Sequence, residues 1–194
     1  MRVRLMNAAA RRLVVWCGAV LAVGVAVTAV TVTAGRPSPI QPGLTPAQQD
    51  ETLRAHNVWR ARAAVVPLCW AEDLAARAQA RAGYLAANGC LMVHGPLPAD
   101  VGENLFRAGP LHGEGRPNQL FVVTPTQVVD MWGAESTYYS TVLHTCAPNR
   151  QCGHYTQLVW AATREVGCGM SVCPTLGQIW VCNYRPRGNV WFYR

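Results

Sequence analysis

The alternation of apolar and polar residues predicts a pair of strands near the end of the chain. Residues 166–172 and 178–184 alternate apolar side chains with small or polar ones, which is the period of a strand with one buried face. Only a few residues separate the two runs. The pattern therefore predicts that they pair with each other as a hairpin.

Two segments carry the same start signal of a helix. The sequences TPAQ at 45–48 and TPTQ at 124–127 each combine an N-cap threonine, a proline at the first helical position and a glutamine that can close a capping box. The first signal predicts a helix over about 46–64. The second signal opens another predicted helix, which carries Val128, Val129, Met131, Trp132 and Glu135.

A further helix is predicted over residues 71–87, which are rich in alanine, leucine and arginine and are followed by Asn88-Gly89, a typical helix end. Helices in the first and middle parts of the chain and paired strands at its end indicate an α+β fold, in which helices cover a sheet. The apolar positions on one face of the 71–87 helix are Leu74, Ala78, Ala82 and Leu85.

The N-terminal segment has the pattern of an export signal. A basic stretch precedes 22 uncharged residues, 13–34, and the small residues at 32–34 suit signal peptidase. An uncharged run of this length can also span a bilayer. Residues 1–34 are therefore predicted to be a signal peptide or an N-terminal membrane anchor, 35–43 a proline-rich linker, and 44–194 a single domain outside the cytoplasm.

The net charge gives no sign of a nucleic-acid partner. Formal charge is +7, but four of the 17 basic residues precede the apolar segment, which leaves 13 arginines against 10 carboxylates, or +3. These charges are scattered, without the basic runs of a nucleic-acid surface. Membrane contact is expected only through the N-terminal segment, if that segment is retained.

The cysteines indicate an oxidising compartment. The chain has eight cysteines, of which Cys17 lies in the apolar segment and seven lie in the domain, so that six can pair and one is left over. A zinc-thiolate site is the alternative, but the chain has no C-x-x-C pair.

Two segments resemble the signatures of a known family. They are GHYTQLVWAAT at 153–163 and IWVCNYRPRGNV at 179–190, and GENL at 102–105 adds an upstream match. Both look like the signatures of the CAP superfamily, which includes cysteine-rich secretory proteins, antigen 5 and pathogenesis-related protein 1 and is also called the SCP domain. The resemblance covers about 48–190 and is to plant-type, single-domain members.

The resemblance implies a three-layer α-β-α sandwich with a central cleft. Two histidines and two glutamates converge there in the family, and by motif these are His94, Glu103, Glu135 and His154. Two imidazoles can bind zinc, although weakly without a third committed ligand. His56 and Asn57 are interpreted as buried architecture, and His112 and His144 as structural or solvated.

The family also implies a set of disulfides. Cys69 departs from the pattern, and it is interpreted either as a free buried thiol or as the site of an intermolecular disulfide. The implied pairs, which the sequence alone leaves open among 15 connectivities, are Cys90–Cys173, Cys146–Cys152 and Cys168–Cys182.

The function implied by the resemblance is that of a secreted protein that binds a small apolar ligand, a sterol or a fatty acid, in defence or host interaction. The alternatives are a secreted hydrolase or protease that uses the His/Glu cleft, and a protein–protein signalling effector whose partner is unknown. The stretch 107–123 is longer than in compact plant-type members. It is interpreted as a loop with an extra strand or, functionally, as a lip over the cleft or a lipid portal.

Overall fold

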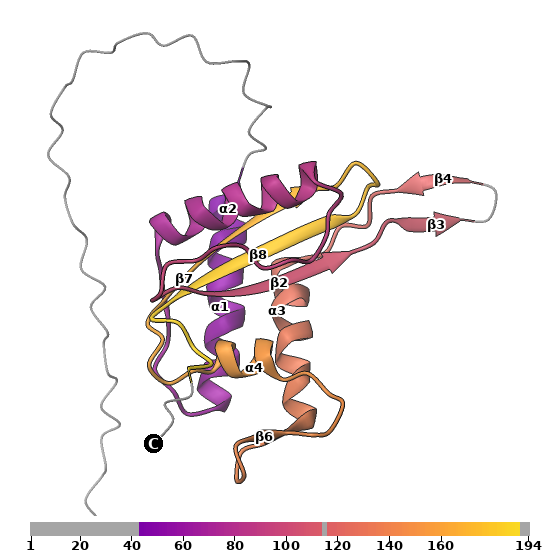
Figure 1. Ribbon diagram of the computed structural model, residues 1–194. Helices are drawn as coiled ribbons and strands as arrows, with labels where there is room; N and C mark the ends of the chain where they lie inside the picture. The colour runs from indigo at the N-terminus through magenta and orange to yellow at the C-terminus, as the bar shows by residue number, and fades with distance from the viewer. Residues whose placement is uncertain (1–42, 114–115, 191–194) are drawn as a thin grey trace, which may run out of the picture. The chain divides into compact units, whose positions relative to one another are not determined.

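The computed structural model describes residues 43–113 and 116–190 (Figure 1). The contacts of the chain group Arg36–Arg194 into one compact unit. The predicted leader, 1–34, and nearly all of the predicted linker lie outside the described residues. Within the described part of the chain, every helix is too short or too polar to cross a membrane.

The centre of the domain is a four-stranded sheet. The strands stand in the order β1-β7-β8-β2, with β7 and β8 antiparallel, β2 antiparallel to β8, and β1 parallel to β7. The predicted hairpin is confirmed as β7 and β8. The bounds of the four strands are β1 Cys69–Trp70, β2 Gly102–Ala108, β7 Glu165–Val172 and β8 Gln178–Arg185.

Helices cover both faces of the sheet, as Figure 1 shows. One face is covered by α2, Glu72–Ala87. The other face is covered by α1, Pro46–Arg62, together with α3, Pro125–Gly133, and the short α4, Gly153–Leu158. These are the three layers of the predicted α-β-α sandwich.

Local signals fix where the helices begin. Both predicted capping boxes form, with the side chain of Thr45 capping α1 and that of Thr124 capping α3.

Helix α2 packs so close to β7 that a side chain at Gly167 would approach the backbone nitrogen of Ala75 to 2.1 Å. Glycine is therefore required there for the contact between helix and strand.

The predicted end of the third helix was wrong, because the helix stops before Glu135. Helix α3 stops at Gly133, and the next residues form a 3-10 helix, η1, Ala134–Tyr138, which carries Glu135. After it come two short paired strands, β5 Tyr139–Ser140 and β6 Thr145–Cys146. In this 3-10 helix Glu135 lies within hydrogen-bonding distance of the backbone of α4.

The predicted disulfides are confirmed. Cys69 is half-buried in β1 and is disulfide-bonded, so its interpretation as a free buried thiol is wrong. The three pairs are Cys90–Cys173, Cys146–Cys152 and Cys168–Cys182.

The long stretch 107–123 contains the end of β2 and a separate hairpin of β3, Leu111–Gly113, and β4, Arg116–Gln119. In Figure 1 this hairpin projects beyond the end of β2 and away from α4. The extra strand is thus present as two short strands. No described residue of this stretch lines the cleft that contains His94 and His154.

Candidate functional site

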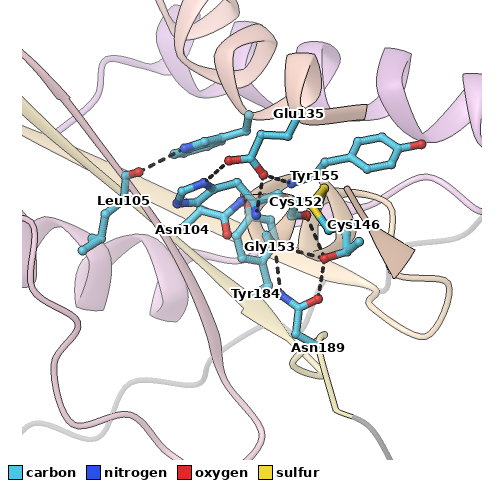
Figure 2. A network of polar contacts seen from close by, with 12 residues as sticks. Asn104, Leu105, Glu135, Cys146, Cys152, Gly153, Tyr155, Tyr184 and Asn189 are labelled. Carbon is cyan, nitrogen blue, oxygen red and sulfur yellow. Dashed lines mark hydrogen bonds and ion pairs between the residues drawn. A yellow bond between two sulfur atoms is a disulfide. The ribbon is translucent and has the colours of Figure 1, made fainter. Parts of the chain in front are cut away.

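Glu135 and His154 form a tightly bonded pair between η1 and α4 (Figure 2). His154 Nδ1 donates to Glu135 Oε1 at 2.6 Å, and the backbone N–H groups of His154 and Tyr155 donate to Oε2 at 3.0 and 3.1 Å. The carboxylate therefore caps the first turn of α4 and orients the imidazole at the same time. The Cys146–Cys152 disulfide holds the turn that leads into this helix.

The surroundings of Glu135 favour its charged form. Burial raises the pKa of the carboxyl group, but the hydrogen bonds from the His154 ring and from two backbone amides outweigh it and lower the pKa. A carboxylate that remains ionised accepts hydrogen bonds and cannot donate them. The Nδ1 atom of His154 consequently carries the proton.

His94 and Glu103 form the second pair. His94 Nδ1 lies 2.9 Å from Glu103 Oε1, and the exposed fractions of the two side chains are 61% and 1%. The hydrogen bond to Glu103 raises the pKa of His94, against a smaller lowering by burial and by Arg81. The glutamate is thus the buried anchor and the histidine is the exposed group.

A hydrogen-bonded chain connects the core to the backbone beneath His154. His56 is fully buried, which lowers its pKa to about 4, and it donates from Nδ1 to the carbonyl of Thr52 at 2.8 Å. Its Nε2 therefore accepts from the hydroxyl of Tyr184 at 2.9 Å. Asn104 donates both to that hydroxyl and to the carbonyl of His154, at 3.3 and 3.1 Å.

Trp132 supports the other side of the imidazole. Its ring stacks with that of His154 at a centroid distance of 6.3 Å, and its indole nitrogen donates to the carbonyl of Leu105 (Figure 2). Trp132 of α3 and Glu135 of η1 therefore both contact His154.

These groups border a cleft of about 530 Å³. His94, Glu103 and His154 line it, whereas Glu135 lies behind His154 and acts through it. In each histidine Nδ1 is bound to a carboxylate, and none of the described residues bonds to Nε2. The cleft therefore presents two oriented imidazoles with a free nitrogen. The remaining wall residues are Met92, Asn104, Leu105, Gln151, Gly153 and Asn189.

A second cluster of potential metal ligands does not form a metal site. In the described part of the chain, His56, Cys168 and Cys182 are the one group of three whose ligand atoms lie within 4.8 Å of one another. The two sulfurs are joined in a disulfide and offer no thiolate, and both ring nitrogens of His56 are hydrogen-bonded. The cluster is part of the core.

A second pocket, which the sequence did not predict, lies at the C-terminal end of α1. This groove of about 680 Å³ lies among α1, the β5–β6 hairpin and α4. The rings of Trp59 and Tyr139 both meet that of Tyr155 edge-on, with centroids 6.4 and 5.8 Å away. No single sequence motif predicts this groove, because its wall residues come from three separate segments of the chain. They are Arg62, Ala63, Ala64, Val65, Tyr139, Thr141, His144, Tyr155, Thr156, Val159, Trp160 and Ala161.

Relatives of known family share most of the domain. Pathogenesis-related protein 1C of Nicotiana tabacum is 42% identical over 142 residues, which cover 73% of this chain and 77% of that protein. Pathogenesis-related protein 1 of Arabidopsis thaliana is 38% identical over 138 residues, covering 71% and 75%.

Solved structures share the fold at lower identity. Schistosoma mansoni venom allergen-like protein 4 matches with a TM-score of 0.58 at 22% identity, over 75% of this chain and 92% of that one. NaASP2 with Zn²⁺ matches with a TM-score of 0.56 at 21% identity, over 80% and 86%.

A family model described as the cysteine-rich secretory protein family matches residues 53–184. The chain therefore belongs to the cysteine-rich secretory protein, or CAP, family.

Proposed function

We propose that this protein is secreted and binds a fatty acid in the groove at the C-terminal end of α1. The observation that carries the proposal is the composition of the groove. Aromatic and aliphatic side chains form its walls, while the exposed Arg62 stands at its edge. Apolar walls with a small number of placed polar groups are typical of small-molecule sites, and about 680 Å³ lies within their usual range of volume.

Arg62 favours a fatty acid over a sterol. Its guanidinium lies 4.5 Å from the ring centroid of Trp59, which keeps the cation beside the groove. A carboxylate can form a charge-assisted hydrogen bond with this group, whereas the hydroxyl of a sterol gains less from it. His144 lines the same groove and adds a second donor.

The test is saturable binding of labelled palmitate to residues 36–194. Ala161→Trp should abolish binding, because Ala161 is an exposed wall residue and an indole there fills the groove. Arg62→Gln should weaken palmitate binding by roughly threefold to fivefold, the effect of an exposed charge pair. It should leave cholesterol binding unchanged.

Ala162→Trp is the matched control. Ala162 is the adjacent exposed alanine and is not part of the groove wall, so palmitate should bind this variant as it binds the wild type. Equal binding by both tryptophan variants would contradict the assignment of the groove. Cholesterol binding that Ala161→Trp abolishes, without any palmitate binding, would replace the fatty acid by a sterol.

The His/Glu cleft supports a second proposed activity, the binding of zinc. The observation in its favour is that His94 and His154 are each oriented by a carboxylate on Nδ1, an arrangement that commonly supports zinc-ligating histidines. Their Nε2 atoms would be the ligands, and zinc would supply a Lewis acid in the cleft. With two histidines and no thiolate, water would have to complete the coordination, so binding should be weak.

Isothermal titration with zinc chloride at neutral pH tests this proposal. The wild-type domain should bind one ion saturably, and His94→Ala/His154→Ala should bind none while remaining folded. His112→Ala/His144→Ala removes the same number of histidines from exposed positions outside the cleft and should behave as the wild type. Zinc binding that survives in the first variant would place the ion elsewhere.

A role in defence or host interaction is part of the proposal. Its support is that relatives covering most of the domain are pathogenesis-related proteins of plants. The three disulfides suit an extracellular environment.

A further inference from the structure

The turn between β5 and β6 exposes two consecutive aliphatic side chains. Val142 is 86% exposed and Leu143 is 71% exposed, the largest exposures among the big apolar side chains of the described residues. Both protrude from the hairpin, where they contribute little to the core. Apolar side chains presented together at a protruding tip are suited to enter another apolar phase.

The tip is held in place by the fold. Tyr139 pairs with Cys146 and Ser140 with Thr145 across the two strands. The hydroxyl of Ser140 accepts from the backbone nitrogen of Leu143 at 3.2 Å, and the disulfide of Cys146 ties the hairpin to α4. The aliphatic pair is therefore presented in a fixed position, and docking would require little ordering of the chain.

The segment that carries the tip is basic. The sequence from 136 to 164 contains no aspartate or glutamate, but it contains Arg150, Arg164 and two histidines. The guanidinium of Arg150 lies 4.4 Å from the ring centroid of Tyr138, which is itself 40% exposed. Aromatic rings with a polar edge beside arginines are typical of groups at a membrane–water interface.

The proposed fatty-acid groove opens beside this tip. Thr141 and His144, the residues that flank the aliphatic pair, line the groove together with Arg62 at the end of α1. In Figure 1 the β5–β6 hairpin and the C-terminal end of α1 lie at the same lower end of the domain. A membrane or protein surface into which Val142 and Leu143 insert would therefore lie next to the groove.

We propose that Val142 and Leu143, with Tyr138, Arg62 and Arg150 around them, form a surface that docks on membranes rich in anionic lipid. The apolar pair enters the acyl boundary, and the arginines lie against the headgroups. Charge complementarity favours an anionic bilayer as the occupant. That the docked protein exchanges a fatty acid with the membrane rests on the proposed function of the groove, whereas docking itself does not.

Co-sedimentation of residues 36–194 with lipid vesicles tests the proposal, without added fatty acid. The wild type should bind vesicles of phosphatidylcholine and phosphatidylglycerol, and it should bind those of phosphatidylcholine alone more weakly. High salt should reduce binding to the mixed vesicles. Val142→Ser/Leu143→Ser should weaken binding to them by about tenfold or more, because two apolar side chains no longer enter the bilayer.

Leu111→Ser/Val122→Ser is the matched control, since these aliphatic residues are 49% and 64% exposed in the β3–β4 region. This variant should bind vesicles as the wild type does. Loss of binding in the control, with full binding by Val142→Ser/Leu143→Ser, would overturn the proposal and place docking at β3–β4. Absence of vesicle binding by the wild type would also overturn it.

Palmitate binding in solution separates this proposal from that of the groove. Neither Val142 nor Leu143 lines the groove, so their double variant should retain palmitate binding. If the wild type binds palmitate but does not bind vesicles, membrane docking is rejected and the function of the groove is not. Vesicle docking by a wild type that binds no palmitate would reject the groove's function and leave the membrane surface supported.

Discussion

The paired substitution Cys90→Ala/Cys173→Ala is expected to lower the free energy of unfolding by about 4 kcal/mol, a large fraction of the stability of an ordinary domain. The two cysteines are 83 residues apart, and their bond joins the end of α2 to the end of β7. Closing so long a loop restricts the unfolded chain strongly. Urea unfolding followed by tryptophan fluorescence measures the change.

Cys146→Ala/Cys152→Ala provides the comparison. These cysteines are only six residues apart, so the same entropic argument gives a loss of about 2 kcal/mol. Their bond lies beside His154, so this variant should disturb the cleft more than the first one does. Equal losses of stability in the two double variants would show that loop length does not determine the contribution of these disulfides.

Arg60→Leu is expected to destabilise the domain by about 3–4 kcal/mol. Arg60 has no exposed surface, and its guanidinium donates to the backbone carbonyl oxygens of four residues. Leucine would remove all four hydrogen bonds at once, although the carbonyl oxygens of Trp160 and Thr163 also accept from the backbone N–H of Thr163 and from the Arg164 side chain. The carbonyls, at 2.7–3.0 Å from the donor nitrogens, belong to Val66, Leu158, Trp160 and Thr163.

Arg54→Leu is the control for this effect, because Arg54 is an exposed residue of the same helix. The free energy of unfolding of this variant should differ from that of the wild type by no more than about 0.5 kcal/mol. Arg60→Lys should fall between the two, since an ammonium keeps the charge but cannot reach four carbonyls in different directions. If Arg60→Leu unfolds at the same urea concentration as Arg54→Leu, Arg60 does not hold these segments together.

The His/Glu cleft and the groove at the C-terminal end of α1 differ in how they are built. Carboxylates and backbone amides hold the histidines of the cleft, and a buried chain from His56 through Tyr184 and Asn104 stabilises the backbone below them. The groove is enclosed by aromatic and aliphatic contacts and has a cation at its edge. The first arrangement suits an ion and the second an apolar chain.

The sequence alone determined the local features of the fold. The capping boxes at Thr45 and Thr124, the end of α2 at Ala87 and the alternation in β7 and β8 each depend on residues close together in the chain, so their signals are complete within a short window. The family motifs predicted a set of His94, Glu103, Glu135 and His154, which form two hydrogen-bonded pairs. The resemblance also implied the disulfides Cys90–Cys173, Cys146–Cys152 and Cys168–Cys182.

How these residues are used depends on contacts between distant parts of the chain. The end of α3 before Glu135 was missed, because the carboxylate's partners are the amides of α4, which lie about 20 residues further along the chain. Arg60 would be expected on the surface, as arginines usually are, and is buried because carbonyls of the loop after α1 and of the distant segment 158–163 converge on it. The groove likewise joins three separate segments. Such contacts depend on how the layers pack, which no local pattern of residues specifies.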